Sequence, residues 1–161
     1  MSFYYKNLID LCIKNNFTIS LAESCTGGMI ASNLISISGA SKVIDFGLVT
    51  YSNNSKKKLL NIPKMKINKY GAVSQEIAQF MVEGLLKKTD SNILIGVTGI
   101  AGPNGGTHEK PVGLVYHSFY FRENNELIIK KNFFNGNRTN IRKDASNFTV
   151  EFIYKKLISF I

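Results

Sequence analysis

The sequence is poor in the residues that build metal sites and disulfide frameworks. Among its 161 residues there are two cysteines, Cys12 and Cys25, and two histidines, His108 and His117. The cysteines form no Cys-x-x-Cys pair, and no histidine stands near either of them at metal-ligand spacing. We therefore expect no zinc site and no disulfide framework, which fits a protein of a reducing compartment.

Long hydrophobic runs are also missing. No window offers the roughly 20 apolar residues that a membrane-spanning helix needs, and the first residues lack the basic, apolar and small-residue order of a signal peptide. We expect a soluble cytoplasmic protein. With 44% apolar residues, a chain of this length can bury one core, so residues 1–161 are predicted to form one domain.

Acidic residues are scarce. Eleven Asp and Glu face 20 Lys and Arg, which gives a net charge of +9 and could favour nucleic acid, an anionic surface or a phosphorylated small molecule. Apart from Lys56–Lys58 and the lysines from Lys64 to Lys69, the charge is spread along the chain. No Arg-rich helix or aromatic ribonucleoprotein motif is present. We interpret the charge as a compositional bias and do not expect a nucleic-acid partner.

Apolar spacing predicts helices that alternate with strands. Polar and glycine-containing segments separate them, and a basic connector follows Pro63. Helices are expected at 3–15, 29–37, 52–60, 74–86 and 137–159, and strands at 17–22, 43–51, 92–98, 112–121 and 126–134. The last two strands are close enough for a hairpin, so the sheet is expected to be mixed. The predicted fold is a single three-layer α/β domain, with a mixed β-sheet flanked by helices.

A turn of small residues, Ser24–Gly28, follows the first predicted strand. Ser24 is placed there as a nucleophile would be, and the amides that begin the next helix could stabilise an oxyanion or a phosphate. Alternatively, Ser24 or Thr26 only caps that helix. Cys25 is a rival nucleophile, or else an inert buried cysteine. The turn matches neither the Walker loop nor the Gly-x-Ser-x-Gly elbow.

A serine nucleophile needs a base, and histidine is poorly supplied. Lys56 follows closely on a strand end, and a lysine in a partly dry pocket can lose its proton near neutral pH. The alternative is that Lys56–Lys58 form a solvated helix face.

Two further segments are typical of ligand binding. Thr98–Gly106 holds four glycines and one proline, which suits close approach to a ligand, although a flexible surface loop is equally compatible. Arg138 and Arg142 are four apart at the start of the last helix, so both could grip a phosphate, or both could be solvated.

Taken in order, these segments resemble the CinA C-terminal domain family, the bacterial nicotinamide mononucleotide deamidases, also called competence and damage-inducible proteins. The likeness covers most of the chain and depends on shared order and spacing. It is carried by Ala22-Glu-Ser-Cys-Thr-Gly-Gly28, Tyr51-Ser-Asn, Gly71-Ala-Val-Ser74, Thr98-Gly-Ile-Ala-Gly-Pro103, Lys110-Pro-Val-Gly113 and Gly136-Asn-Arg138.

The resemblance implies a stand-alone serine amidohydrolase in which Ser24 and Lys56 form a catalytic dyad. It would convert nicotinamide mononucleotide to nicotinic acid mononucleotide and ammonia in pyridine nucleotide recycling, as a homodimer without metal or organic cofactor. The residues expected to bind substrate are Thr26, Gly27, Gly28, Tyr51, Thr98, Gly99, Ala101, Gly102, Arg138 and Arg142. The alternative is a non-catalytic nucleotide-binding or interaction module linked to competence or the DNA-damage response.

Overall fold

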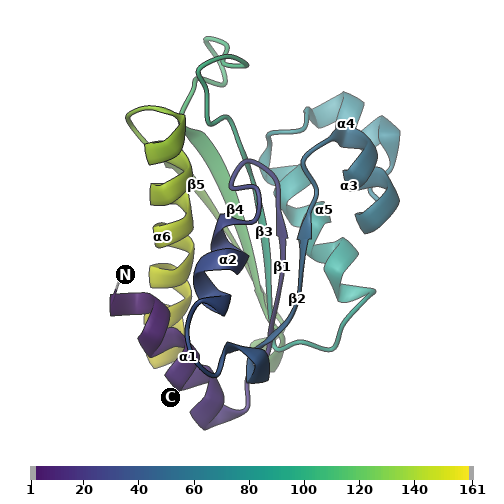
Figure 1. The fold of residues 1–161 in the computed structure, drawn as a ribbon. Coiled ribbons are helices and arrows are strands. Elements are labelled where there is room, and N and C mark those ends of the chain that lie inside the picture. The colour runs from purple at the N-terminus through teal and green to yellow at the C-terminus, as the bar shows by residue number, and fades with distance from the viewer. Residues whose placement is uncertain (1–2, 160–161) are drawn as a thin grey trace.

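The computed structural model describes residues 3–159, which form a five-stranded β-sheet between two layers of helices (Figure 1). Strands β1, β2 and β3 are parallel, and β4 runs antiparallel to both of its neighbours. The sheet order is β2-β1-β3-β4-β5. The strands are β1 Ile19–Glu23, β2 Ile44–Val49, β3 Ile93–Gly99, β4 Leu114–Phe121 and β5 Glu126–Phe133. The predicted mixed-sheet α/β domain is confirmed.

Every expected helix is present, and one further helix lies where a connector was expected. The helices are α1 Phe3–Asn15, α2 Met29–Ile35, α3 Asn53–Leu60, α4 Lys64–Tyr70, α5 Gln75–Leu86 and α6 Arg138–Ile158. The connector prediction was wrong because lysines alternate with apolar residues there, which conceals the helical period. Packing of the buried Ile67 on the α5 side of the sheet stabilises α4. Helix α2 also ends two residues earlier than expected.

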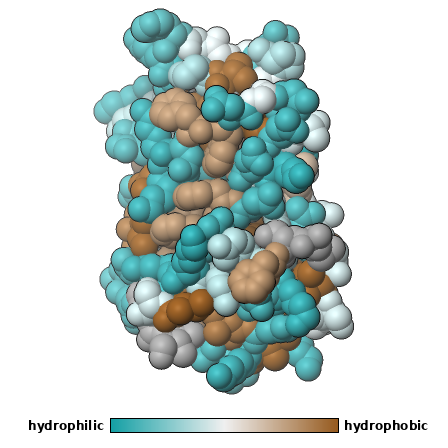
Figure 2. Space-filling view, turned by 90° about the vertical axis from the view of Figure 1, so that its left-hand side faces the viewer, coloured by the Kyte–Doolittle hydropathy of each residue, from teal (hydrophilic) through white to brown (hydrophobic). Residues whose placement is uncertain are grey.

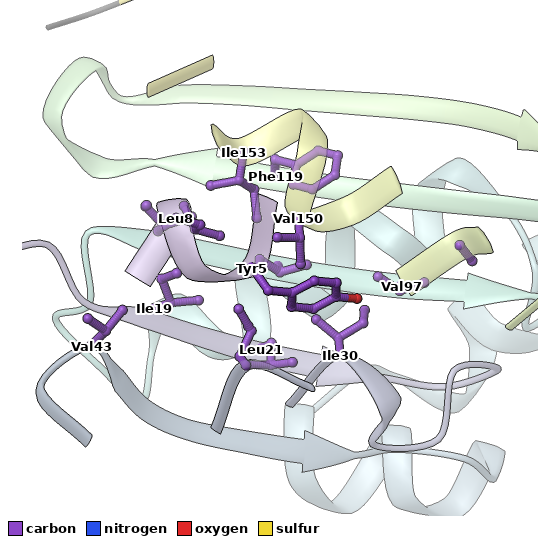
Figure 3. Packing of buried hydrophobic residues seen from close by; sticks show 14 of the residues in the cluster. Tyr5, Leu8, Ile19, Leu21, Ile30, Val43, Val97, Phe119, Val150 and Ile153 are labelled. Atoms are coloured by element: carbon purple, nitrogen blue, oxygen red, sulfur yellow. The ribbon is translucent and has the colours of Figure 1, made fainter. Parts of the chain in front are cut away.

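The helices divide between the two faces of the sheet, so the core has two halves (Figure 1). On one face α1, α2 and α6 cover β1, β3 and β4, and Tyr5, Ile30 and Phe119 pack together in this half (Figure 3). On the other face α3, α4 and α5 bury Leu60, Ile67 and Met81. Residues of β1 and β3 are buried on both sides of the sheet, as is usual for parallel strands covered by helices on both faces.

The carboxyl ends of β1, β2 and β3 meet at one edge of the sheet. The chain leaves β1 toward β2 through α2 on one face, and it leaves β2 toward β3 through α3, α4 and α5 on the other. In open α/β sheets such a reversal leaves a crevice at the strand ends, where ligands bind. Helix α6 also begins at this edge (Figure 1).

The outer face formed by α1, α6 and β5 carries apolar side chains among polar ones (Figure 2). Large hydrophobic side chains exposed on these three elements are Phe3, Leu127, Phe133 and Ile158. None of the helices within residues 3–159 is long and apolar enough to cross a membrane.

Candidate active site

Ser24 and Lys56 lie in direct contact at the carboxyl end of β1. The Ser24 amide donates to the carbonyl of Val97 in β3 over 2.9 Å, so the chain stays attached to the neighbouring strand as it turns. The Lys56 Nζ donates to Ser24 Oγ over 2.8 Å. Both side chains are buried, with Lys56 only 1% exposed.

Helix α3 places Lys56 next to Ser24. Its N-terminus is fixed by a capping box in which the side chains of Ser52 and Ser55 bond each other's amides. One turn along, Lys56 points inward and its Nζ also donates to the carbonyl of Thr50 over 2.8 Å. Lys57 and Lys58 are exposed. A solvated face is thus the correct interpretation for those two lysines and the wrong one for Lys56.

Burial sets the protonation of Lys56. Desolvation lowers its pKa from 10.5 to about 8, against a smaller opposing effect of the neighbouring Cys25. Within residues 3–159 no carboxylate forms an ion pair with this amine. A substantial neutral fraction near neutral pH gives Lys56 the lone pair that a general base requires.

The turn after Ser24 is closed by Glu23 rather than by a capping hydroxyl. The helix N-cap is Gly28, with φ of 89° and no side-chain cap, so the suggestion that Ser24 or Thr26 caps α2 was wrong. The amide of Gly28 donates to the Glu23 carboxylate, and that of Gly27 to the Ser24 carbonyl. Neither of these two amides is free for an oxyanion, so Gly27 and Gly28 do not supply the oxyanion donors expected at this turn.

Cys25 adjoins the pair but has the wrong protonation state for a nucleophile. It is 5% exposed, and burial raises the pKa of its thiol to about 12. A Cβ on Gly99 would stand 3.0 Å from the Cys25 Sγ and 2.7 Å from the Leu114 carbonyl oxygen. Close packing therefore requires glycine at position 99, and the inert-cysteine interpretation is the better supported one.

A pocket of about 230 Å³ opens over the Ser24–Lys56 pair. Its wall is formed by Ser24, Cys25, Tyr51, Lys56, Ala72, Val73, Thr98, Gly99, Ala101 and Arg138. Sequence reasoning did not place Ala72 and Val73 in a site. The Thr98 hydroxyl donates to the Ala72 carbonyl over 2.7 Å, and Lys110 Nζ donates to that of Val73 over 2.8 Å. Small residues before the Ser74 cap of α5 were the available signal.

The two arginines of α6 have different surroundings. Arg138, at the pocket mouth, donates from Nη1 to the Gly102 carbonyl and from Nη2 to the Tyr51 hydroxyl, each over 2.8 Å. Arg142 donates from Nη2 to the Thr26 carbonyl over 2.8 Å and braces the turn from outside. They do not form one forked grip.

The pocket wall thus brings together most of the expected site residues. The residues that line it are Ser24, Lys56, Tyr51, Thr98, Gly99, Ala101 and Arg138, whereas Thr26, Gly27, Gly28, Gly102 and Arg142 are not part of its wall. Within residues 3–159 no group of three or more His, Cys, Asp or Glu side chains is arranged to hold a metal ion.

Fold and site together define a class: single-domain α/β proteins with a hydrogen-bonded serine–lysine pair at the switch point of a mixed sheet. A model of the CinA C-terminal domain matches residues 2–157. The chain belongs to the CinA C-terminal domain family.

Relatives and solved structures agree with this assignment. A "putative competence-damage inducible protein" of Clostridioides difficile is 50% identical over 136 residues, covering 84% of this chain and 32% of that protein. A "CinA-like protein" of Kosmotoga olearia is 43% identical over 154 residues, covering 96% and 37%. The chain therefore spans about a third of the length of these curated relatives.

Crystal structures of family members have the same fold. A CinA superfamily protein from Klebsiella pneumoniae superposes with a TM-score of 0.91 at 28% identity, covering 97% of this chain and 96% of that one. A competence/damage-inducible protein from Agrobacterium tumefaciens gives 0.86 at 37% identity, covering 95% and 97%.

Proposed function

We propose that this protein is a serine amidohydrolase that converts nicotinamide mononucleotide to nicotinic acid mononucleotide and ammonia. The observation that carries the proposal is the 2.8 Å contact between Ser24 Oγ and the buried amine of Lys56. A lysine kept partly neutral beside a serine hydroxyl is the arrangement that activates serine without histidine.

The Thr50 carbonyl supports the role of Lys56 as base. A neutral amine has N–H bonds to donate and one lone pair to offer. Donation to the Thr50 carbonyl over 2.8 Å orients the amine. In the neutral form the contact with Ser24 Oγ, in which Lys56 donates in the structure, would reverse so that the lone pair takes the serine proton. The pKa of about 8 lies close to the pH at which such a base works best.

The reaction then has two halves. Ser24 Oγ attacks the carboxamide carbon while Lys56 takes the serine proton, and the tetrahedral intermediate expels ammonia after Lys56 returns that proton to the nitrogen. Water next attacks the resulting ester, with neutral Lys56 accepting its proton. Lys56 returns this proton to Ser24 Oγ as the ester C–O bond breaks, which restores the Ser24 hydroxyl, and the acid that is released ionises to the carboxylate product.

Pocket size favours an orientation for the substrate. At about 230 Å³, the pocket is smaller than the roughly 300–1,000 Å³ typical of ligand sites, so it suits the amide-bearing ring better than a whole nucleotide. We place the ring above Ser24 and the ribose at the mouth. Arg138, whose guanidinium has five donors and gives two to Gly102 and Tyr51, would hold the 5′-phosphate.

Product analysis tests the proposal. Purified protein is incubated with nicotinamide mononucleotide, ammonia is measured by a coupled assay, and nicotinic acid mononucleotide is measured by chromatography. We expect equal amounts of both products from the wild-type protein and none from Ser24→Ala, which serves as the blank for contaminating amidases. Nucleotide binding without either product would instead favour a non-catalytic module.

A further inference from the structure

Glu23 is a buried carboxylate to which the proposed reaction gives no role. It ends β1 immediately before Ser24 and is 1% exposed. Its Oε2 accepts hydrogen bonds from the amides of Gly28 over 3.0 Å and Ile30 over 3.1 Å, and its Oε1 accepts one from Ala31 over 2.9 Å. All three donors belong to the start of α2.

Through these bonds the Glu23 side chain caps the amides at the start of α2, which the N-cap residue Gly28 cannot do. Gly28 has no side chain to offer at the N-cap position, and the Met29 amide bonds the Thr26 carbonyl. The turn from Ser24 to Gly28 is consequently fixed to Glu23 at both ends, by a peptide bond at one and by a hydrogen bond at the other. The conformation of the Ser24 turn depends on this carboxylate.

The main-chain carbonyl of Glu23 is also connected, through Thr50, to the proposed base Lys56. Its carbonyl oxygen accepts a hydrogen bond from the Thr50 amide over 2.7 Å, and the Thr50 carbonyl accepts one from Lys56 Nζ over 2.8 Å. Because Lys56 in turn bonds Ser24, the contacts close a ring that runs through Glu23, Thr50, Lys56 and Ser24.

We propose that Glu23 is the positioning residue of the Ser24–Lys56 pair, an inference that rests on the proposed amidohydrolase function. It does not touch substrate and exchanges no proton in the reaction. By holding α2 with its side chain and Thr50 with its carbonyl, it fixes the separation between nucleophile and base. In such pairs a misplacement of about 1 Å costs a rate factor of about 100.

The chemistry of the site requires a carboxylate with the length of glutamate. Two oxygens accept three N–H donors, which only an ionised carboxyl group does without offering a proton of its own. In Glu23→Gln an NH₂ group would face at least one of the amides of Gly28, Ile30 and Ala31. In Glu23→Asp the charge remains, but the side chain is one methylene shorter and reaches fewer of these amides.

The test compares Glu23→Gln and Glu23→Asp with a control of matched stability. Val150→Ala empties space in the α1–α6 half of the core, where Val150 is fully buried, and it lowers the thermal midpoint without touching the pocket. All proteins are assayed at a temperature where each is folded. Deamidation is measured by steady-state kinetics, and Ser24 reactivity by labelling with a fluorophosphonate, which needs no nucleotide.

We expect Glu23→Gln to lower kcat by about 100-fold, and the labelling rate with it, while KM changes little because Tyr51 and Arg138 come from other elements. Glu23→Asp should recover part of the loss, and Val150→Ala should keep wild-type kcat. Equal kcat in Glu23→Gln and Val150→Ala would overturn the inference, since Glu23 would then be only a structural cap. If Glu23→Gln does not fold, a wild-type kcat in Glu23→Asp would overturn the inference instead.

Failure of the proposed function gives a different result. A wild-type protein that releases no ammonia contradicts the deamidase assignment. If its Ser24 is still labelled faster than that of Glu23→Gln at matched stability, positioning by Glu23 stands. If labelling is equal, the positioning role is refuted as well.

Discussion

The pH dependence of turnover should follow the protonation of Lys56. Only the neutral amine can take the proton of Ser24, and burial lowers the Lys56 pKa from 10.5 to about 8. At pH 7 a lysine with that pKa is neutral about a tenth of the time, whereas an exposed lysine is neutral about three times in 10,000. Burial in the pocket thus increases the active form about 300-fold.

The expected profile is a rise with a slope near one, followed by a plateau above pH 8. Between pH 6.5 and pH 7.5 the neutral fraction, and with it kcat, should increase about eightfold. The assay is ammonia release at saturating nicotinamide mononucleotide. Saturation matters because the substrate phosphate has its own pKa near 6, which would affect kcat/KM before it affects kcat.

Two variants test whether Lys56 causes the pH dependence of kcat. Lys57→Ala removes an exposed neighbour on the same helix and should leave the midpoint unchanged. Lys56→Arg keeps a positive charge at every accessible pH and should be inactive throughout. A wild-type kcat that is flat from pH 6.5 to pH 8 would refute the claim that Lys56 is the base.

Three further results are expected. Arg138→Ala should raise KM about tenfold or more and change kcat little, since the guanidinium lies at the pocket mouth and is proposed to bind the phosphate; steady-state kinetics with an unchanged KM would contradict this. Gly84→Ala should lower the free energy of unfolding by about 1–3 kcal/mol, because its Cβ would lie close to the Leu60 carbonyl oxygen of α3; urea denaturation with an unaltered midpoint would count against it. Sedimentation should give the mass of two chains, consistent with the exposed apolar side chains of α1, α6 and β5, and a single-chain mass at all concentrations would rule out the homodimer.

Periodicity and turn chemistry in the sequence were enough to predict most of the fold. The helix pattern at residues 3–15 coincides with α1, and the alternation of helices and strands correctly indicated a mixed sheet. Helix α4 was not predicted because its lysines and apolar residues alternate with a period near two. Its helical state depends on packing of Ile67 against distant residues, and local spacing carries no trace of that contact.

Residue type and position at strand ends left both Ser24 and Lys56 open between a catalytic and a structural role, and their pairing was expected from the resemblance to the CinA C-terminal domain family. The two side chains are in contact. Glu23 was not expected to matter, although an acid at the end of an apolar strand and directly before the serine was a visible signal. Arg142 could not be told from Arg138 by spacing, because their partners Thr26, Gly102 and Tyr51 come from distant parts of the chain.

The most direct test of the central claim compares two adjacent pocket residues as nucleophile. Deamidation of nicotinamide mononucleotide is measured for the wild-type protein, Ser24→Ala and Cys25→Ala under identical conditions. The Ser24–Lys56 account predicts that Ser24→Ala loses about 1,000-fold or more of kcat, while Cys25→Ala, which lacks only a thiol with a pKa of about 12, keeps most of it. Retained turnover in Ser24→Ala, with loss in Cys25→Ala, would contradict the account.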